Sequence, residues 1–289
     1  MHDSLQRCVR DLSSSDPTVW RAALLEIQEL GPAAVEAVPD LLRDPERPAD
    51  YWMRIPALIA AMGDGAVPFL RAVLGAPGDG YSRETACNAL RQLGAAAAPA
   101  VPELAAVFLR GGALDHYAAG NALAGAGPAG ISELVKALGE KEPARSTAAH
   151  YLRTAAGADG QRALRAALGE ERCGARAAAA RALLESGAGE AAGTAADRAE
   201  AEAALDAAVR QEAEALAERI ATAGDGAELE AAAGDALAVA GWLSDSSAAG
   251  SAGIRRIAAA LEQRSGPAPG GKPQEALDEI RRWLADHPL

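Results

Sequence analysis

The histidines are the first candidates for chemistry in this sequence. His116 follows Asp115, and an Asp-His pair can take part in proton transfer. Residues adjacent in sequence do not face each other on a helix, however, and no serine or cysteine completes a nucleophilic set. The cysteines form no CxxC or Cys/His cluster, which argues against a disulfide framework or a zinc site: Cys8, Cys87 and Cys173. We therefore predict no catalytic residue, no metal and no cofactor, and expect a protein that is not an enzyme.

Aromatic and basic residues recur at intervals of about 31 residues and form a column: Trp20, Trp52, Arg83, His116, Arg145 and Arg176. Such a column could bind an acidic or peptide partner through ring stacking and bidentate hydrogen bonds. The alternative is structural: the basic residues would bond to neighbouring turns, and the tryptophans would pack between repeats.

Each member of the column stands eleven residues before a small residue that we take as an anchor: Gly31, Gly63, Gly94, Gly127, Ala156 and Gly187. Four residues before each anchor stands a large aliphatic residue: Ile27, Ile59, Leu90, Leu123, Leu152 and Leu183. Together with alanine or isoleucine eight residues before the anchor, these positions mark one face of a helix. Because glycine enters the left-handed region easily, the anchor predicts the end of that helix.

A second helix is predicted to follow each turn. Its start is marked by Val38-Pro39, Val67-Pro68 and Val101-Pro102, since proline is favoured in the first helical turn. The fourth copy is Ile131-Ser132, where the proline is lost. Each unit is therefore helix–turn–helix, and one unit cannot bury both of its apolar faces without neighbours.

This pattern, from Trp20 through Gly31 to Val38-Pro39-Asp40-Leu41 and in its later copies, resembles HEAT repeats, particularly the short bacterial kind also seen in phycobilin lyases. The resemblance implies an all-α fold: an α-solenoid of about six helical hairpins, the first helix of each on the convex side and the second on the concave side. We expect a capping helix within residues 1–15, repeats over 16–188, and an acidic helical region over 189–289 that is either degenerate repeats or a cap.

The charge distribution bears on the class of partner. Formal net charge is −12, and residues 189–289 carry 9 basic and 18 acidic side chains. Because proteins that follow phosphates carry a basic stripe, we do not expect nucleic acid binding. No stretch reaches about 20 uninterrupted apolar residues, and the first residues do not resemble a signal peptide, so we expect a cytoplasmic protein and no membrane contact. Only 3 of the 28 basic residues are lysines, a bias expected of a GC-rich bacterial genome.

We accordingly expect a non-catalytic scaffold or adaptor that binds an unidentified protein along the groove of the solenoid, as a regulator or an immunity-type inhibitor. Besides the column, the groove candidates are Asp40, Arg43, Arg71, Glu103, Arg110, Glu133 and Lys136. The alternative is an enzyme built from HEAT-like repeats, of the alkylpurine DNA glycosylase or bilin lyase type.

Overall fold

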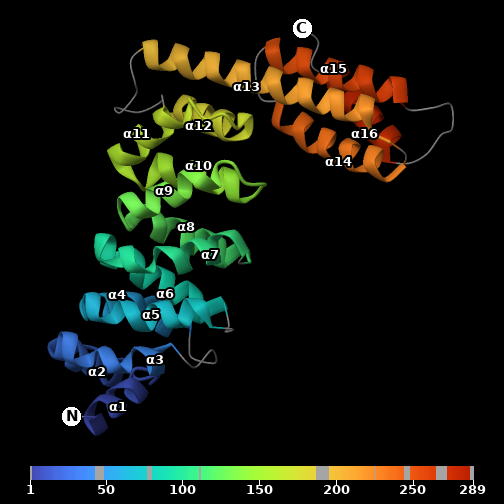
Figure 1. Ribbon diagram of the computed structural model, residues 1–289. Coiled ribbons are helices and arrows are strands. Elements are labelled where there is room, and N and C mark those ends of the chain that lie inside the picture. Colours follow the sequence, from blue (N-terminus) through green and yellow to red (C-terminus); the bar gives the residue numbers. More distant parts are fainter. Residues whose placement is uncertain are drawn as a thin grey trace. The chain divides into compact units, whose positions relative to one another are not determined.

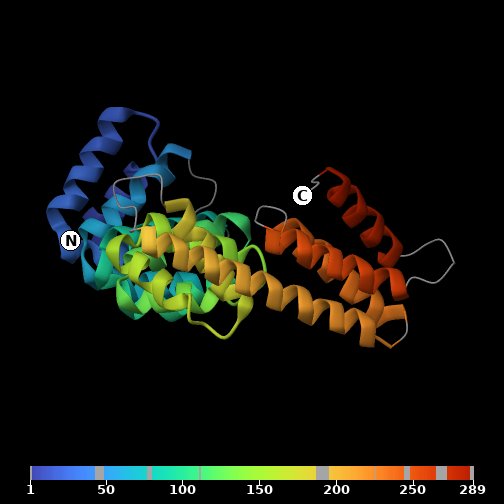
Figure 2. The ribbon, with the colours of Figure 1, turned by 90° about the horizontal axis from the view of Figure 1, so that it is seen from above.

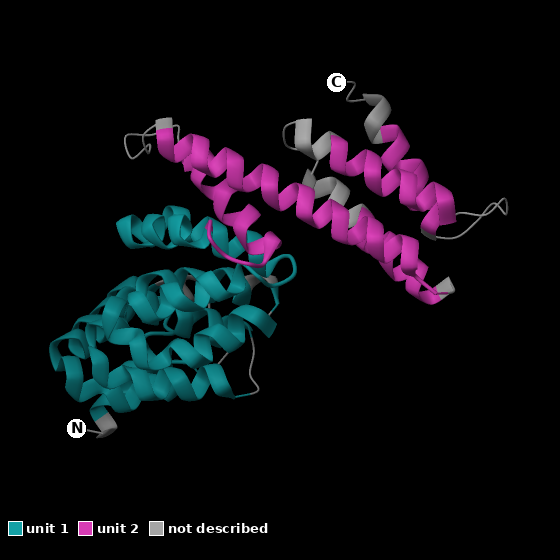
Figure 3. Cartoon of the chain, turned by 45° about the horizontal axis from the view of Figure 1, so that its top comes forward, with its two compact units in different colours: residues 1–167 teal, residues 168–289 magenta. Residues whose placement is uncertain are grey.

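The chain divides into two compact units, residues 1–167 and residues 168–289 (Figure 3). The computed structural model describes residues 2–42, 49–76, 80–110, 112–186, 195–224, 226–243, 248–264 and 272–286. Within these ranges every regular element is an α-helix or a 3-10 helix, which confirms the all-α prediction.

The N-terminal unit is a stack of helical hairpins in chain order (Figure 1). It begins with α1 (His2–Asp11), which packs against the first hairpin. The first helices of the hairpins are α2 (Pro17–Leu30), α4 (Ala49–Ala61), α6 (Gly80–Leu93), α8 (Ala113–Gly125) and α10 (Ala144–Thr154). The second helices are α3 (Val38–Leu41), α5 (Val67–Gly75), α7 (Val101–Arg110), α9 (Pro128–Ala137) and α11 (Gly157–Ala167).

These helices form two layers. Each first helix contacts the first helix of the next hairpin, and each second helix contacts the next second helix. The aliphatic position four residues before the anchor is completely buried in all five hairpins of this unit: Ile27, Ile59, Leu90, Leu123 and Leu152. Burying such a side chain contributes about 1.5–3 kcal/mol, so the stripe that the period predicts is the core between the layers.

The turns between the helices follow the anchor glycines. Gly31, Gly63, Gly94 and Gly127 all have positive φ, between 50° and 78°. After three of them the chain forms short 3-10 helices: η1 (Gly31–Ala37), η2 (Asp64–Ala66) and η3 (Gly94–Ala100).

Two details of the turns differ from the prediction. In the fifth hairpin Gly157, with φ 57°, replaces the predicted Ala156, because a Cβ disfavours the left-handed region. In the fourth hairpin the helix starts at Pro128 rather than at Ile131, so its proline has moved forward to the residue after Gly127.

The C-terminal unit is a group of longer helices: α12 (Cys173–Ser186), α13 (Ala195–Thr222), α14 (Gly226–Leu243), α15 (Ala248–Arg264) and α16 (Lys272–Asp286). The long α13 packs against α12, α14 and α15, and α16 packs against α14 and α15 (Figure 2). Their shared core is aliphatic: Leu205, Val209, Leu216, Ile220, Ile254, Ile257, Leu261, Leu277 and Ile280.

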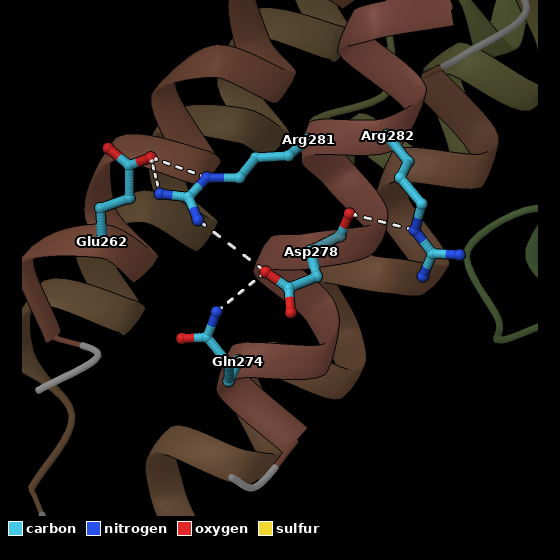
Figure 4. A network of polar contacts seen from close by, with 5 residues as sticks. All are labelled: Glu262, Gln274, Asp278, Arg281 and Arg282. Atoms are coloured by element: carbon cyan, nitrogen blue, oxygen red, sulfur yellow. Dashed lines mark hydrogen bonds and ion pairs between the residues drawn. The ribbon is translucent and has the colours of Figure 1, made fainter. Parts of the chain in front are cut away.

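Exposed ion pairs join the helices of this unit at their surfaces. Arg256 of α15 pairs with Glu214 of α13, and Arg264 donates to the carbonyl oxygen of Gly224 at 2.8 Å, so α13 and α15 run parallel. The Arg281 guanidinium lies 2.7 Å from the Glu262 carboxylate and joins α16 to α15 (Figure 4). Pairs this exposed add little stability individually.

By length and apolar content alone, residues 80–110 could cross a membrane, and so could the bent pair 54–61 and 64–75. They are the helices α4 to α7 of the stack, whose buried faces contact neighbouring hairpins. Core helices of this kind pass the same test, so we assign them to the repeat core. The cytoplasmic location stays a prediction.

We expect Gly130→Ala to lower the free energy of unfolding by about 2 kcal/mol, because the added Cβ would overpack the helix pair. That Cβ would lie 2.0 Å from the Leu123 carbonyl oxygen of the preceding helix. Gly75→Ala is the matched control, since a Cβ there meets nothing within 4 Å. Denaturant unfolding of the two variants measures the difference, and equal stabilities would contradict the close approach of α8 and α9.

Candidate functional site

The tryptophan end of the column joins the first two hairpins. The guanidinium carbon of Arg54 on α4 lies 3.6 Å from the centre of the Trp20 ring on α2, and that of Arg21 lies 5.2 Å away. Both are cation–π contacts, so the Trp20 ring is already stacked within the chain. Trp52 lies on α4, and its side chain is outside the described residues.

Arg83 of the column joins the third hairpin to the fourth. Its Nε and Nη2 donate to Oδ2 of Asp115 at 2.9 and 2.8 Å, and the Asp115 side chain is only 5% exposed. The other oxygen of Asp115, Oδ1, is buried without a hydrogen-bond partner in the described part of the chain. A buried carboxylate held by a single arginine depends on that arginine for its charge compensation.

The remaining column residues bind carbonyl oxygens just upstream of their own helices. His116 Nδ1 lies 2.6 Å from the Phe108 oxygen, and Arg145 Nε donates to the Glu140 oxygen at 3.0 Å. In the C-terminal unit, Arg176 Nη1 donates to the Glu170 oxygen at 2.9 Å. A helix leaves its last carbonyl groups without partners inside the helix. The column residues therefore supply hydrogen-bond donors to carbonyl oxygens in the connections between successive hairpins.

The groove candidates are only partly brought together. Arg71 of α5 and Glu103 of α7 form an ion pair of 2.8 Å between successive second helices, and this hydrogen bond lowers the pKa of Glu103. Lys136 pairs with Glu133 within α9 at 2.6 Å. Asp40 lies half-buried on α3 and Arg110 exposed at the end of α7, while Arg43 lies outside the described residues.

The cysteines are shielded from solvent to different degrees. Cys8 and Cys87 are buried and Cys173 is half-buried, and all three are free thiols. Burial, helped by the charge of Asp115, raises the pKa of Cys87 to about 12, so this thiol stays protonated at neutral pH. No group of three or more potential metal ligands occurs in the described ranges.

A pocket of about 370 Å³ lies between two successive inter-hairpin connections of the N-terminal unit. We call it the inter-repeat pocket. It is lined by Phe108, Leu109, Gly112, His116, Glu140, Lys141, Glu142, Pro143 and Ala144. These residues come from the end of α7, the start of α8, and the connection from α9 into α10. The volume falls within the range of about 300–1,000 Å³ that is usual for ligand sites.

Aromatic rings form the buried wall of the inter-repeat pocket. Phe108 stacks on His116 with ring centres 4.3 Å apart, and Tyr117 meets the same imidazole edge-on at 6.0 Å. Gly120 makes room for this packing, because a Cβ there would lie within 3 Å of both Tyr151 and Phe108. Leu109, which lines the pocket, is 50% exposed, and Tyr117, which contacts the His116 ring but does not line the pocket, is 56% exposed.

The His116 imidazole joins two connections on the same wall. The Phe108 carbonyl can only accept, so His116 Nδ1 carries the proton of that 2.6 Å bond. The other ring nitrogen, Nε2, lies 3.4 Å from the Pro143 carbonyl oxygen, which also accepts hydrogen bonds from the Thr147 N–H and the Ser146 hydroxyl, both at 3.1 Å. Glu140, Lys141 and Glu142 are exposed at the rim, and Glu142 also accepts the backbone N–H of Ser146 at 3.2 Å.

Sequence reasoning selected His116 but missed the rest of the inter-repeat pocket. Phe108, Leu109, Tyr117 and Pro143 were not singled out. One signal was available: the chain has only 2 Phe and 4 Tyr, and three of these six residues, Phe108, Tyr117 and Tyr151, fall within one span of 44 positions.

Comparison with known proteins finds similarity to solved structures alone. No protein-family model matches the chain, and no curated protein sequence matches it. Human deoxyhypusine hydroxylase is similar over 99% of this chain and 97% of its own, with 17% identity and a TM-score of 0.31. The complex of CpcE and CpcF of phycocyanin lyase from Nostoc sp. PCC7120 is similar over 98% of this chain and 94% of its own, with 19% identity and a TM-score of 0.26. An engineered protein is similar over 98% of both chains, with 18% identity and a TM-score of 0.23.

The expectation that the chain is not an enzyme is contradicted by these comparisons. Of the three structures named above, one is a hydroxylase and one is a lyase, so similarity to them gives no reason to exclude catalysis. Identities below 20% describe the fold and carry no activity over to this chain.

We expect Arg83→Met to lower the free energy of unfolding by about 3 kcal/mol, because it leaves the buried Asp115 carboxylate without its cation. Arg71→Met is the matched control, and its effect should be smaller because the Arg71 side chain is 43% exposed. Urea unfolding at neutral pH measures both. If Arg83→Met/Asp115→Leu is no more stable than Arg83→Met, the explanation by an unpaired buried charge is wrong.

Proposed function

We propose that this protein binds a protein partner, with the inter-repeat pocket of the N-terminal unit as the docking site. The observation that carries the proposal is a pocket of about 370 Å³ that is lined by the half-exposed Leu109, with the half-exposed Tyr117 against the His116 imidazole of its wall. Partially exposed apolar side chains next to a concavity are typical of interaction sites, and tyrosine is frequent among the residues that dominate binding energy.

The hydrogen bonds of the column favour the inter-repeat pocket over the column as the main contact. Arg83 and Arg145 are engaged within the chain, and Trp20 is already stacked with arginine. A partner that used these groups would have to compete with those contacts. Leu109 and Tyr117 present apolar surface whose burial is favourable without such a loss. That the column and groove residues bind the partner stays a prediction.

The net charge of −12 favours a protein partner over nucleic acid. The proposal concerns recognition, and it suits a regulator or an enzyme equally, since a HEAT-like enzyme that acts on a protein would also need a site to hold it.

The test compares two double variants, each of which replaces one exposed leucine and one exposed tyrosine by serine. Leu109→Ser/Tyr117→Ser alters the inter-repeat pocket, whereas Leu25→Ser/Tyr81→Ser alters a leucine that is 58% exposed and a tyrosine that is 56% exposed elsewhere in the same unit. Each tagged chain is purified from its native host, and proteins recovered in stoichiometric amounts are identified. The affinity for a recovered protein is then measured with purified components.

We expect the pocket variant to weaken that affinity by at least about tenfold, as is usual when a central interface residue is removed, and the control to keep it. Thermal unfolding of both variants checks that the loss is not caused by misfolding. Equal affinity of the two variants would contradict the proposal.

A further inference from the structure

We infer that Arg83 is a positioning residue of the inter-repeat pocket: through Asp115 it holds the first turn of α8, and with it His116 and Tyr117, in the geometry that the partner meets. This inference rests on the proposed function and extends the site to a residue that does not line the pocket. It depends on what the first turn of α8 carries and on how that turn is held.

The first turn of α8 carries much of the site. Gly112 and His116 line the pocket, and the Tyr117 ring lies 6.0 Å from the His116 ring. Gly112 is the N-cap of α8, and its carbonyl oxygen accepts the His116 N–H at 2.9 Å. Because glycine has no side chain, this N-cap cannot accept a hydrogen bond from the first N–H groups of the helix, as serine or aspartate would. The position of the turn therefore depends on contacts with other helices.

Asp115 and His116 supply those contacts on two sides. Neighbouring residues of a helix point in different directions. Asp115 reaches α6 in the layer of first helices, where Arg83 Nε and Nη2 donate to its Oδ2 at 2.9 and 2.8 Å. His116 reaches the end of α7 in the layer of second helices, where Nδ1 donates to the Phe108 carbonyl oxygen. The turn is thus held between the two layers.

The ion pair tolerates little displacement of the turn. Both N–H groups of Arg83 bind the same oxygen of Asp115, and the Asp115 side chain is only 5% exposed. Its other oxygen, Oδ1, is buried and has no hydrogen-bond partner among the described residues. A shift of α8 that broke the bonds to Oδ2 would therefore leave a buried carboxylate uncompensated, which is costly.

A second ion pair of the same kind offers a control. Arg71 Nε and Nη2 donate to a single oxygen of Glu103, so this pair also joins successive hairpins. Neither of these residues lines the pocket or lies next in sequence to a residue that does. Removing this pair should leave the first turn of α8 in place.

The test reads the His116 ring in the folded, full-length chain. The bond to Phe108 requires the proton on Nδ1, and the tautomer of an imidazole is set by such bonds. NMR of the chain with isotope-labelled histidine, at about pH 8 where a free imidazole is neutral, measures this tautomer. His116→Gln identifies the signal. The variants are Arg83→Met, Arg83→Met/Asp115→Leu and, as the control, Arg71→Met.

We expect the Nδ1–H form to predominate in the wild-type chain and in Arg71→Met, and to lose its predominance in both variants that lack Arg83. The double variant separates position from stability. It leaves no unpaired buried charge, so it stays folded even where Arg83→Met does not, but leucine and methionine give α8 no directional contact. If the double variant is folded and keeps the Nδ1–H form, Arg83 only stabilises the fold and the inference is wrong. A wild-type His116 with its proton on Nε2 also overturns it.

The affinity for the partner recovered under the proposed function gives a second readout. The double variant should weaken it by about 3- to 30-fold, as for residues that act through a neighbour, and Arg71→Met should keep it. If the double variant keeps full affinity while Leu109→Ser/Tyr117→Ser loses its partner, the inference is wrong and the proposed function stands. If Leu109→Ser/Tyr117→Ser keeps its partner, the proposed function is wrong, and the His116 tautomer alone decides whether Arg83 positions this ring.

Discussion

Burial of an apolar stripe between successive hairpins is the constraint on which the N-terminal unit depends. Ile27, Ile59, Leu90, Leu123 and Leu152 occupy the same repeat position and are fully buried, each between the two layers of helices. A single hairpin would leave this face in water, so no hairpin is stable without its neighbours. The two layers and the order of the hairpins follow from this requirement, and so does the alignment of the connections between hairpins along one edge.

The polar backbone at those connections creates a second requirement. Each second helix ends with carbonyl groups that no further turn of helix can satisfy. Side chains near the start of the next first helix bond to carbonyl oxygens in this region, as His116 does to Phe108 and Arg145 to Glu140. The repeating column of aromatic and basic residues therefore has a structural role, with Arg83 and Trp20 adding contacts between neighbouring hairpins.

The inter-repeat pocket lies where one column side chain contacts carbonyl oxygens of two connections at once. His116 bonds to the connection before its own helix and faces the Pro143 oxygen of the next connection, so its imidazole forms a wall between them. The same contacts that stabilise the stack thus place an aromatic pair and two carboxylates around one opening. His116 can therefore stabilise the stack and also form part of a recognition site.

The sequence by itself determined the all-α class, the period, the buried stripe and most of the turns, because helix periodicity and the backbone preferences of glycine and proline act locally. It also predicted that residues 189–289 are helical, and the described part of that region forms helices α13 to α16. It misplaced the turn at Gly157 and the start of α9 at Pro128, where a neighbouring residue met the same local requirement. Only the tertiary structure brought Phe108, His116 and Pro143 together and paired Arg83 with Asp115. Those contacts join different hairpins, and no local preference specifies which side chains meet across them.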